Sequence, residues 1–211
     1  MRILFQGDSV TDAGRNYEDG RDIGPGYPAY TVKLLKEAFP DKEIEFINRG
    51  ISGNRTEHLV ARLQKDFLDL KPDLVTLLIG VNDCWHSCPP TNIPTTDEQF
   101  ESNLRTVLGA LAAENIPVVM MEPFSLPSPN LQDFRADLAR RTDIERRLAR
   151  EYDNVLAYIP LDGPAYADAV QHGLTHLTDD GVHPNETGRA WIGGLLADTL
   201  IPILKDKFFR S

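Results

Sequence analysis

The fold is decided by Leu-Val-Thr-Leu-Leu-Ile at residues 74–79, followed directly by Gly-Val-Asn-Asp at 80–83. The first six of these residues form a short, almost continuously apolar run. Such a run is typical of a central parallel strand that is covered on both faces. Four further short, mostly aliphatic runs predict strands at 2–6, 44–48, 117–121 and 155–159.

Longer amphipathic stretches separate these strands. We expect helices over 27–39, 56–70, 97–115, 131–152 and 184–207. In the third of these, apolar residues follow a 3.6-residue period and Asp97 lies near the N-cap. The alternation of strands and helices predicts an α/β fold in which a five-stranded parallel sheet lies between two helix layers. No repeat or linker divides the sequence, so we expect one domain over residues 1–211.

The charge balance argues against two classes of partner. The chain has 32 acidic and 22 basic residues and a formal net charge of -10. Nucleic acids and anionic membranes select for basic patches, so we expect neither as a partner. No apolar run approaches the roughly 20 residues of a spanning helix, and no signal-peptide pattern precedes the first strand. We therefore expect a cytoplasmic protein, with Cys84 and Cys88 as reduced thiols.

Polar, glycine-containing stretches follow the predicted strands. They occupy 7–12, 48–54 and 80–83, and a fourth one, 179–184, precedes the last helix. Because parallel strands present their carboxyl ends at one edge of a sheet, we expect these stretches to meet there.

The residue types in these stretches suit acyl transfer. A serine hydroxyl becomes a nucleophile when a base accepts its proton and an acid orients that base. Ser9 could be that nucleophile, with His183 as base and either Asp180 or Asp179 as the orienting acid. Backbone N–H groups of Ser9 and Gly53 and the side-chain amide of Asn82 could then donate to the developing oxyanion.

The four stretches resemble the four sequence blocks of the SGNH, or GDSL-type, hydrolase superfamily. The matching blocks are Gly-Asp-Ser-Val at 7–10, the glycine at 53, Gly-Val-Asn-Asp at 80–83 and Asp-x-x-His at 180–183. They occur in the family's order, and the resemblance extends from residue 5 to about 184. It implies a flavodoxin-like three-layer sandwich, a serine esterase mechanism, and neither a metal nor an organic cofactor.

The resemblance also assigns roles to residues. It implies Ser9 as nucleophile, His183 as general base and then acid, and Asp180, rather than Asp179, as the orienting carboxylate. It implies that the Ser9 and Gly53 backbones and the Asn82 amide form the oxyanion hole.

Within the superfamily, several segments look like those of intracellular carbohydrate acetylesterases that act on acetylxylan and xylo-oligosaccharides. These segments are 7–15, 24–27, 48–54, 80–85 and 122–124. The resemblance thus implies an O-acetylated sugar as substrate and suggests a homo-oligomer.

Three residues beside these blocks are candidate substrate contacts, each with an alternative role. Asp8 could instead hold its loop by hydrogen bonds, and Arg55 could cap the helix that follows it. Trp85 could stack on a sugar face or belong to a core or interface.

Two alternative functions remain open. An esterase, thioesterase or lysophospholipase of other acyl specificity would use the same residues, although a long acyl chain needs an apolar groove and no apolar insertion is evident. A non-catalytic carbohydrate-binding protein would not need Ser9, Asp180 and His183 together.

Overall fold

The computed structural model describes residues 1–129 and 131–209, so Asn130, Arg210 and Ser211 of the predicted domain lie outside the described residues. All neighbouring strands pair in parallel, in the order β2-β1-β3-β4-β5. The strands are β1 (Arg2–Gly7), β2 (Glu45–Asn48), β3 (Leu74–Leu78), β4 (Val118–Met121) and β5 (Val155–Ile159). The predicted five-stranded parallel sheet is confirmed.

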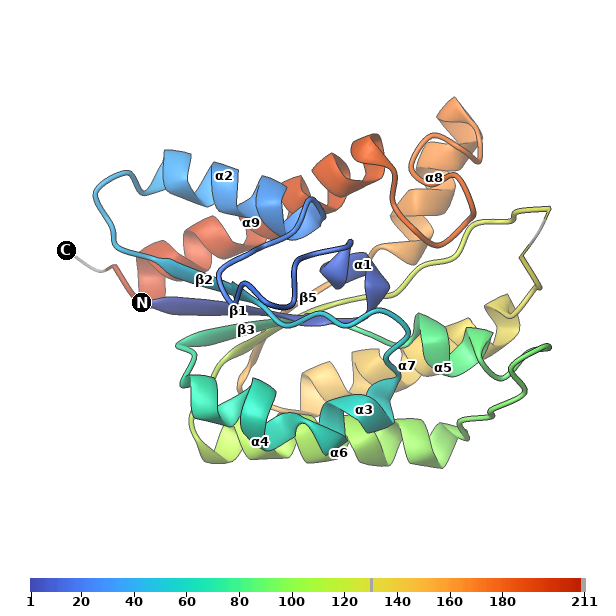
Figure 1. Ribbon diagram of the computed structural model, residues 1–211, viewed down its shortest axis with the longest axis horizontal. Helices are drawn as coiled ribbons and strands as arrows, with labels where there is room; N and C mark the ends of the chain where they lie inside the picture. The colour runs from blue at the N-terminus through green and yellow to red at the C-terminus, as the bar shows by residue number, and fades with distance from the viewer. Residues whose placement is uncertain (130, 210–211) are drawn as a thin grey trace.

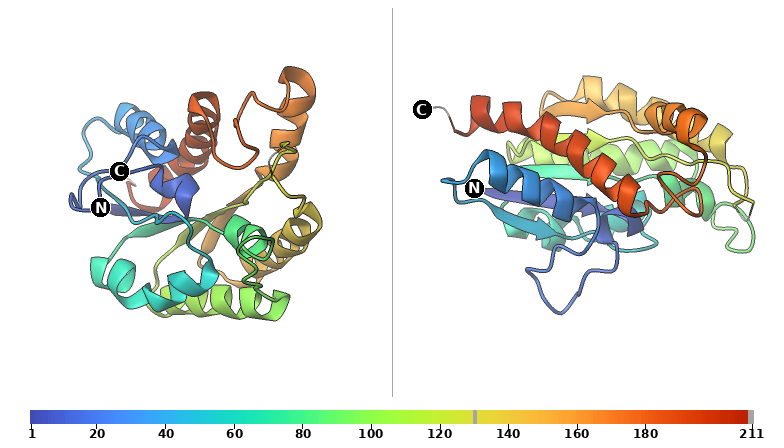
Figure 2. Two further views of the ribbon diagram at one scale, coloured as in Figure 1. Left: turned by 45° about the vertical axis from the view of Figure 1, so that its right-hand side comes forward. Right: turned by 90° about the horizontal axis from the view of Figure 1, so that it is seen from above.

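Helices cover both faces of this sheet (Figure 1). One face carries α2 (Tyr27–Ala38), α8 (Asp162–His172) and α9 (Glu186–Lys207). The opposite face carries α3 (Thr56–Ala61), α4 (Leu63–Asp66), α6 (Asp97–Ala113) and α7 (Arg135–Glu151). The left view of Figure 2 shows the two helix layers above and below the sheet. The three-layer α/β fold is therefore confirmed.

The side chains of β1 explain how the sheet joins both layers. Ile3 and Phe5 belong to the core under α2 and α9, whereas Leu4 belongs to the core under α6 and α7. Successive side chains of a strand point to opposite faces, and apolar residues at all three positions require a covered sheet on both sides.

The direction of the strand connections reverses beside the end of β1. This strand lies between β2 and β3, so the connections leaving β1 and β3 run to opposite faces of the sheet. Ligands of open α/β sheets bind at such a reversal, beyond the carboxyl ends of the strands. Two short helices begin there, α1 (Ser9–Asp12) after β1 and α5 (Val81–Trp85) after β3.

The single helix predicted over 56–70 is wrong. The segment forms α3, α4 and a short 3₁₀ turn, Leu68–Leu70. The break lies at Arg62, whose φ of -111° and ψ of 11° depart from helical values.

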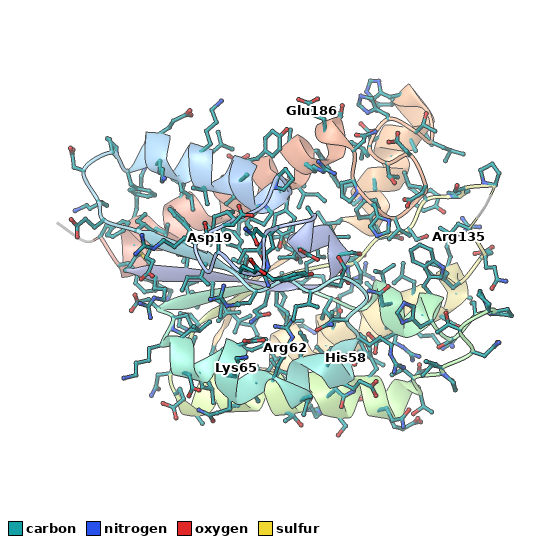
Figure 3. The ribbon with its side chains drawn as sticks, viewed as in Figure 1. Asp19, His58, Arg62, Lys65, Arg135 and Glu186 are labelled. Carbon is teal, nitrogen blue, oxygen red and sulfur yellow. The ribbon has the colours of Figure 1, made fainter. Side chains whose placement is uncertain are left out.

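The side chain of Arg62 accounts for this break. Its guanidinium donates to the carbonyl oxygens of Arg49 at 2.9 Å and Gly7 at 3.3 Å, and to Asn54 Oδ1 at 2.9 Å. Figure 3 labels Arg62 on the α3–α4 side of the sheet. The break in the helix therefore places the Arg62 guanidinium against backbone carbonyl groups at the ends of β1 and β2. The local sequence pattern does not predict these contacts.

Other differences concern helix ends and short helices. The N-cap of α6 is Thr96, with Asp97 as its first residue, and α7 begins only at Arg135. The last helix starts at Glu186 because Asn185 caps it, accepting from the N–H of Gly188 at 3.1 Å. The sequence analysis did not predict α1, α5 or α8. None of the helices in the described part of the chain has the length and apolarity needed to cross a membrane.

Candidate active site

Ser9 lies immediately beyond the carboxyl end of β1, as the first residue of α1. Asp8 caps this helix, with its Oδ1 accepting from the N–H of Val10 at 3.0 Å. A Cβ at position 7 would lie 2.2 Å from the carbonyl oxygen of Leu78, so only glycine fits between β1 and β3 here. This close approach fixes the turn that presents Ser9.

The structure brings Ser9, His183 and Asp180 together as the sequence predicts. Ser9 Oγ lies 2.9 Å from His183 Nε2, and His183 Nδ1 lies 2.6 Å from Asp180 Oδ2. With the proton of a neutral imidazole on Nδ1, that nitrogen donates to Asp180 and Nε2 accepts from the Ser9 hydroxyl. This arrangement can remove a proton from the hydroxyl.

Asp180, and not Asp179, orients the imidazole. Its Oδ1 accepts from the N–H groups of Val182 at 2.9 Å and His183 at 2.7 Å. Although partial burial raises the pKa of the Asp180 carboxyl, the hydrogen bonds from the His183 side chain and from these N–H groups outweigh it and lower the pKa. Asp179 instead accepts from Asn185 Nδ2 at 3.4 Å.

Asn82 lies buried at the start of α5, only 4% exposed. Its Nδ2 donates to the carbonyl oxygen of Asn54 at 3.0 Å, which leaves the second amide hydrogen for another acceptor. The neighbouring Asp83 accepts from the N–H of Thr56 at 3.0 Å and from its hydroxyl at 2.7 Å. These contacts join the loop after β3 to the loop after β2.

Two backbone donors lie in the same linked loops. Gly53 has a φ of +79°, a conformation that favours glycine, and directly precedes Asn54. The carbonyl of Gly7 accepts from the N–H of Ile51 at 3.2 Å, which ties this loop to the turn before Ser9. Within 1–129 and 131–209, the N–H groups of Ser9 and Gly53 have no hydrogen-bond acceptor. They are available to a substrate oxygen.

The three candidate substrate contacts differ in placement. Trp85 lies beside the site, its ring centroid 5.9 Å from that of His183 and 6.3 Å from that of Phe134. Asp8 is buried, and burial raises its pKa to about 7 despite the N–H of Val10. The position of Asp8 matches the loop-holding alternative.

Arg55 is also buried, and its contacts are internal. Its Nη1 donates to the carbonyl of Ile93 at 3.2 Å and to Thr95 Oγ1 at 3.1 Å, and its Nη2 pairs with Glu57. Arg55 thus joins the start of α3 to the segment before α6.

The sequence analysis missed Asp12, a buried residue of α1. Its Oδ2 accepts from the N–H of Ser52 at 3.0 Å and also from the Ser52 hydroxyl. The two residues are 40 positions apart in sequence, so no local pattern predicts their contact. The only available signal was that Asp12 follows the block with Ser9 and Ser52 directly precedes Gly53.

A second missed residue is Glu145 of α7, which is buried beneath the loop after β3. A Cβ at Gly80 would lie 3.2 Å from its Oε1, an oxygen without a hydrogen-bond partner. Tyr158 donates to its Oε2 at 3.2 Å. Burial raises the pKa of Glu145 well above its ordinary value, because the buried carboxyl group disfavours its charged form.

Metal ligands do not gather in this region. No group of three or more histidine, cysteine, aspartate or glutamate side chains among the described residues is arranged to hold a metal ion. The groups that meet at this site are a serine hydroxyl, an imidazole, a carboxylate and N–H donors.

The sequence matches the family described as the GDSL-like Lipase/Acylhydrolase family over residues 5–191. An acetylxylan esterase from Geobacillus stearothermophilus is 31% identical over 199 residues, covering 89% of this chain and 88% of that protein. An arylesterase from Vibrio mimicus is 28% identical, with 86% of each covered. The Escherichia coli (strain K12) thioesterase 1/protease 1/lysophospholipase L1 is 26% identical, covering 96% of this chain and 84% of that protein.

Solved structures share the whole fold. A putative GDSL-like lipase from Parabacteroides merdae superposes with a TM-score of 0.88 at 31% identity, covering 94% of both chains. A variant of an acetyl-xylooligosaccharide esterase from Geobacillus has a TM-score of 0.81 at 28% identity, covering 100% of this chain and 96% of that one.

Proposed function

Because the chain belongs to the GDSL-like lipase/acylhydrolase family and is a carboxylic ester hydrolase, we propose that it removes O-acetyl groups from xylo-oligosaccharides or related carbohydrates. The observation that carries this proposal is the hydrogen-bonded series from Ser9 through His183 to Asp180. An acyl-serine intermediate is the direct consequence of such an arrangement.

In the proposed first half-reaction, His183 Nε2 accepts the hydroxyl proton while Ser9 Oγ attacks the ester carbonyl carbon. Negative charge then develops on the carbonyl oxygen, where the N–H groups of Ser9 and Gly53 and the free amide hydrogen of Asn82 are the donors we assign to it. The imidazolium returns the proton to the departing sugar oxygen, and the acetyl group stays on Ser9.

In the second half-reaction, water takes the place of the sugar. Neutral His183 accepts a proton from that water as its oxygen attacks the acetyl carbonyl carbon. The bond between the acetyl group and Ser9 Oγ then breaks, the imidazolium returns the proton to Ser9 Oγ, and acetate is released. Asp180 stabilises the imidazolium in both halves and keeps the ring in one orientation.

Two observations support an acetylated carbohydrate as substrate. The 31% identical relative is an acetylxylan esterase, and a structural neighbour is an acetyl-xylooligosaccharide esterase. The ring of Trp85 also lies next to that of His183, where an aromatic surface suits the apolar face of a pyranose. The arylesterase and thioesterase relatives favour a second candidate, an esterase of other acyl or leaving-group specificity.

Acetate release from acetylated xylo-oligosaccharides tests the proposal. It should be measured beside p-nitrophenyl esters of two, four and eight carbons, for wild type and Ser9→Ala. We expect acetate release, a steep loss of activity beyond two carbons, and neither activity in the variant. Highest activity on the esters with longer acyl chains would agree with the serine mechanism but would reject an acetylated sugar as the substrate. Undiminished turnover by Ser9→Ala would reject the mechanism itself.

A further inference from the structure

A loop of residues 13–26 follows α1 and leads into α2. The right view of Figure 2 shows this blue loop projecting from the body of the molecule, and Figure 3 labels Asp19 within it. The loop carries Tyr17, whose side chain is a large apolar surface that remains 55% exposed. The proposed mechanism does not use the Tyr17 ring.

Tyr17 is exposed but firmly anchored. Its hydroxyl donates to Asp12 Oδ2 at 2.5 Å, and the Arg15 guanidinium carbon lies 4.3 Å from its ring centroid. Arg15 is itself buried and donates through Nε to the carbonyl oxygen of Gly50 at 3.0 Å. Partial burial and the bond to Asp12 raise the pKa of Tyr17, so the phenol remains a donor. An aromatic ring with so little freedom to rotate loses little entropy when it binds a ligand.

The anchor connects Tyr17 to the loop that carries Gly53. The same oxygen, Asp12 Oδ2, accepts from the Tyr17 hydroxyl, the Ser52 hydroxyl and the Ser52 N–H. Ser52 directly precedes Gly53, whose N–H is free to meet a substrate. The Tyr17 hydroxyl and the N–H of Ser52 therefore meet at one carboxylate oxygen next to Gly53, whereas the ring of Trp85 lies beside that of His183.

The chemistry of Tyr17 suits a sugar ring better than an acyl chain. One face of the ring is covered by the Arg15 guanidinium, and its hydroxyl is already engaged. What remains is a flat, exposed aromatic surface bordered by polar groups, which can stack on the apolar face of a pyranose.

We propose that Tyr17 forms a binding subsite for a sugar unit of the substrate other than the one that bears the acetyl group. This inference rests on the proposed function, since it presupposes an oligosaccharide. The subsite makes Tyr17 a specificity residue for chain length, without a part in bond cleavage. An exposed aromatic ring that served a contact between copies of the chain would give no such chain-length effect.

The test compares Tyr17→Ala, Tyr17→Trp and wild type on acetylated xylo-oligosaccharides and on p-nitrophenyl acetate. We expect Tyr17→Ala to raise KM for the oligosaccharide about tenfold, the size of one lost stacking contact, with kcat nearly unchanged. Both constants for p-nitrophenyl acetate, which has no second sugar unit, should change by less than about twofold, because Asp12 keeps both hydrogen bonds from Ser52 when Tyr17 is replaced. Tyr17→Trp should keep a low KM because it keeps an aromatic face. Val170→Ala, which removes another exposed apolar side chain, is the matched control.

A binding measurement separates this inference from the proposed function. Calorimetric titration of xylotetraose into Ser9→Ala and into Ser9→Ala/Tyr17→Ala requires no turnover. Binding by the first protein and about tenfold weaker binding by the second would support the subsite even if acetate release failed. Equal binding by both, no binding by either, or equal kinetic losses on both esters would overturn it.

Discussion

Asp180 contacts His183 at two points, through Oδ2 to the ring Nδ1 at 2.6 Å and through Oδ1 to the backbone N–H at 2.7 Å. One carboxylate thus fixes both the orientation of the imidazole and the turn from which it projects. The three-residue spacing makes both contacts possible, since a turn of this length returns the side chain to its own backbone.

Asp180→Asn should therefore lower kcat on p-nitrophenyl acetate by about 10²–10⁴-fold, with the fold retained. An amide can present its N–H to Nδ1, which favours the tautomer that cannot accept the serine proton at Nε2. Steady-state kinetics would measure the loss. Asp179→Asn is the control and should remain within about twofold of wild type. A loss below about threefold in Asp180→Asn would exclude the orienting role.

Asn82→Ala should lower kcat by about 10²–10³-fold while KM changes little, because the lost donor acts on charge that develops in the transition state. Steady-state kinetics on p-nitrophenyl acetate measures the effect. Thermal unfolding is the control, because the same amide donates to Asn54. A folded variant with less than about threefold loss of kcat would remove Asn82 from the oxyanion hole.

Glu145→Gln should stabilise the protein at neutral and alkaline pH. The ordinary pKa of 4.5 is raised in the folded state, so above pH 4.5 the unfolded chain ionises Glu145 while the folded chain still keeps it protonated. Wild type therefore loses stability as pH rises from 4.5 toward the raised pKa, and the glutamine variant does not.

Thermal unfolding of both proteins from pH 4 to pH 8 checks this. We expect similar unfolding temperatures for the two proteins at pH 4. At pH 8 the unfolding temperature of Glu145→Gln should be higher, by about 2–4 °C for each kcal/mol by which the substitution raises the free energy of unfolding. Asp8 also has a raised pKa, but it is present in both proteins and cancels in the comparison. A midpoint difference independent of pH would contradict the explanation.

Arg62→Lys should destabilise the fold by about 1–3 kcal/mol. An ammonium cannot reproduce the geometry in which one guanidinium reaches Gly7, Arg49 and Asn54. Urea unfolding at equilibrium measures the change. Arg105→Lys is the matched control, because Arg105 forms ion pairs with Glu101 and Glu151 at the surface, and it should change stability by less than about 0.5 kcal/mol. Equal effects of the two substitutions would contradict the role of Arg62.

The strands and their order along the chain were predictable because burial on both faces demands aliphatic runs, as in β3. Helix α8 was not, since its first turn contains Gly163 and Pro164, residues that read as a loop. In the structure the proline lies within the first turn, where its missing N–H costs nothing. The break at Arg62 was hidden for another reason. It arises from contacts between Arg62 and the ends of two strands, and the spacing of apolar residues along a helix carries no information about such contacts.

The same distinction applies to the site. Ser9, Asp180 and His183 were predictable because each lies in a short block whose residue types have a definite chemistry, and the structure brings all three into contact. Their catalytic roles remain predictions until the variants are measured. Asp12 and Glu145 were missed because their importance comes from burial and from partners distant in sequence.

Ser9 and His183 meet across 174 positions of sequence. During synthesis from the amino end, the nucleophile is therefore made long before its base. At about 5–20 residues per second, roughly 9 to 35 seconds separate the two. A nascent chain can form the sheet around Ser9 during that interval. It should not hydrolyse esters, however, until the loop before α9 brings His183 to Ser9 at the end of β1. Esterase activity in a translation reaction would accordingly report completion of the fold, and it should lag behind any signal from the growing sheet.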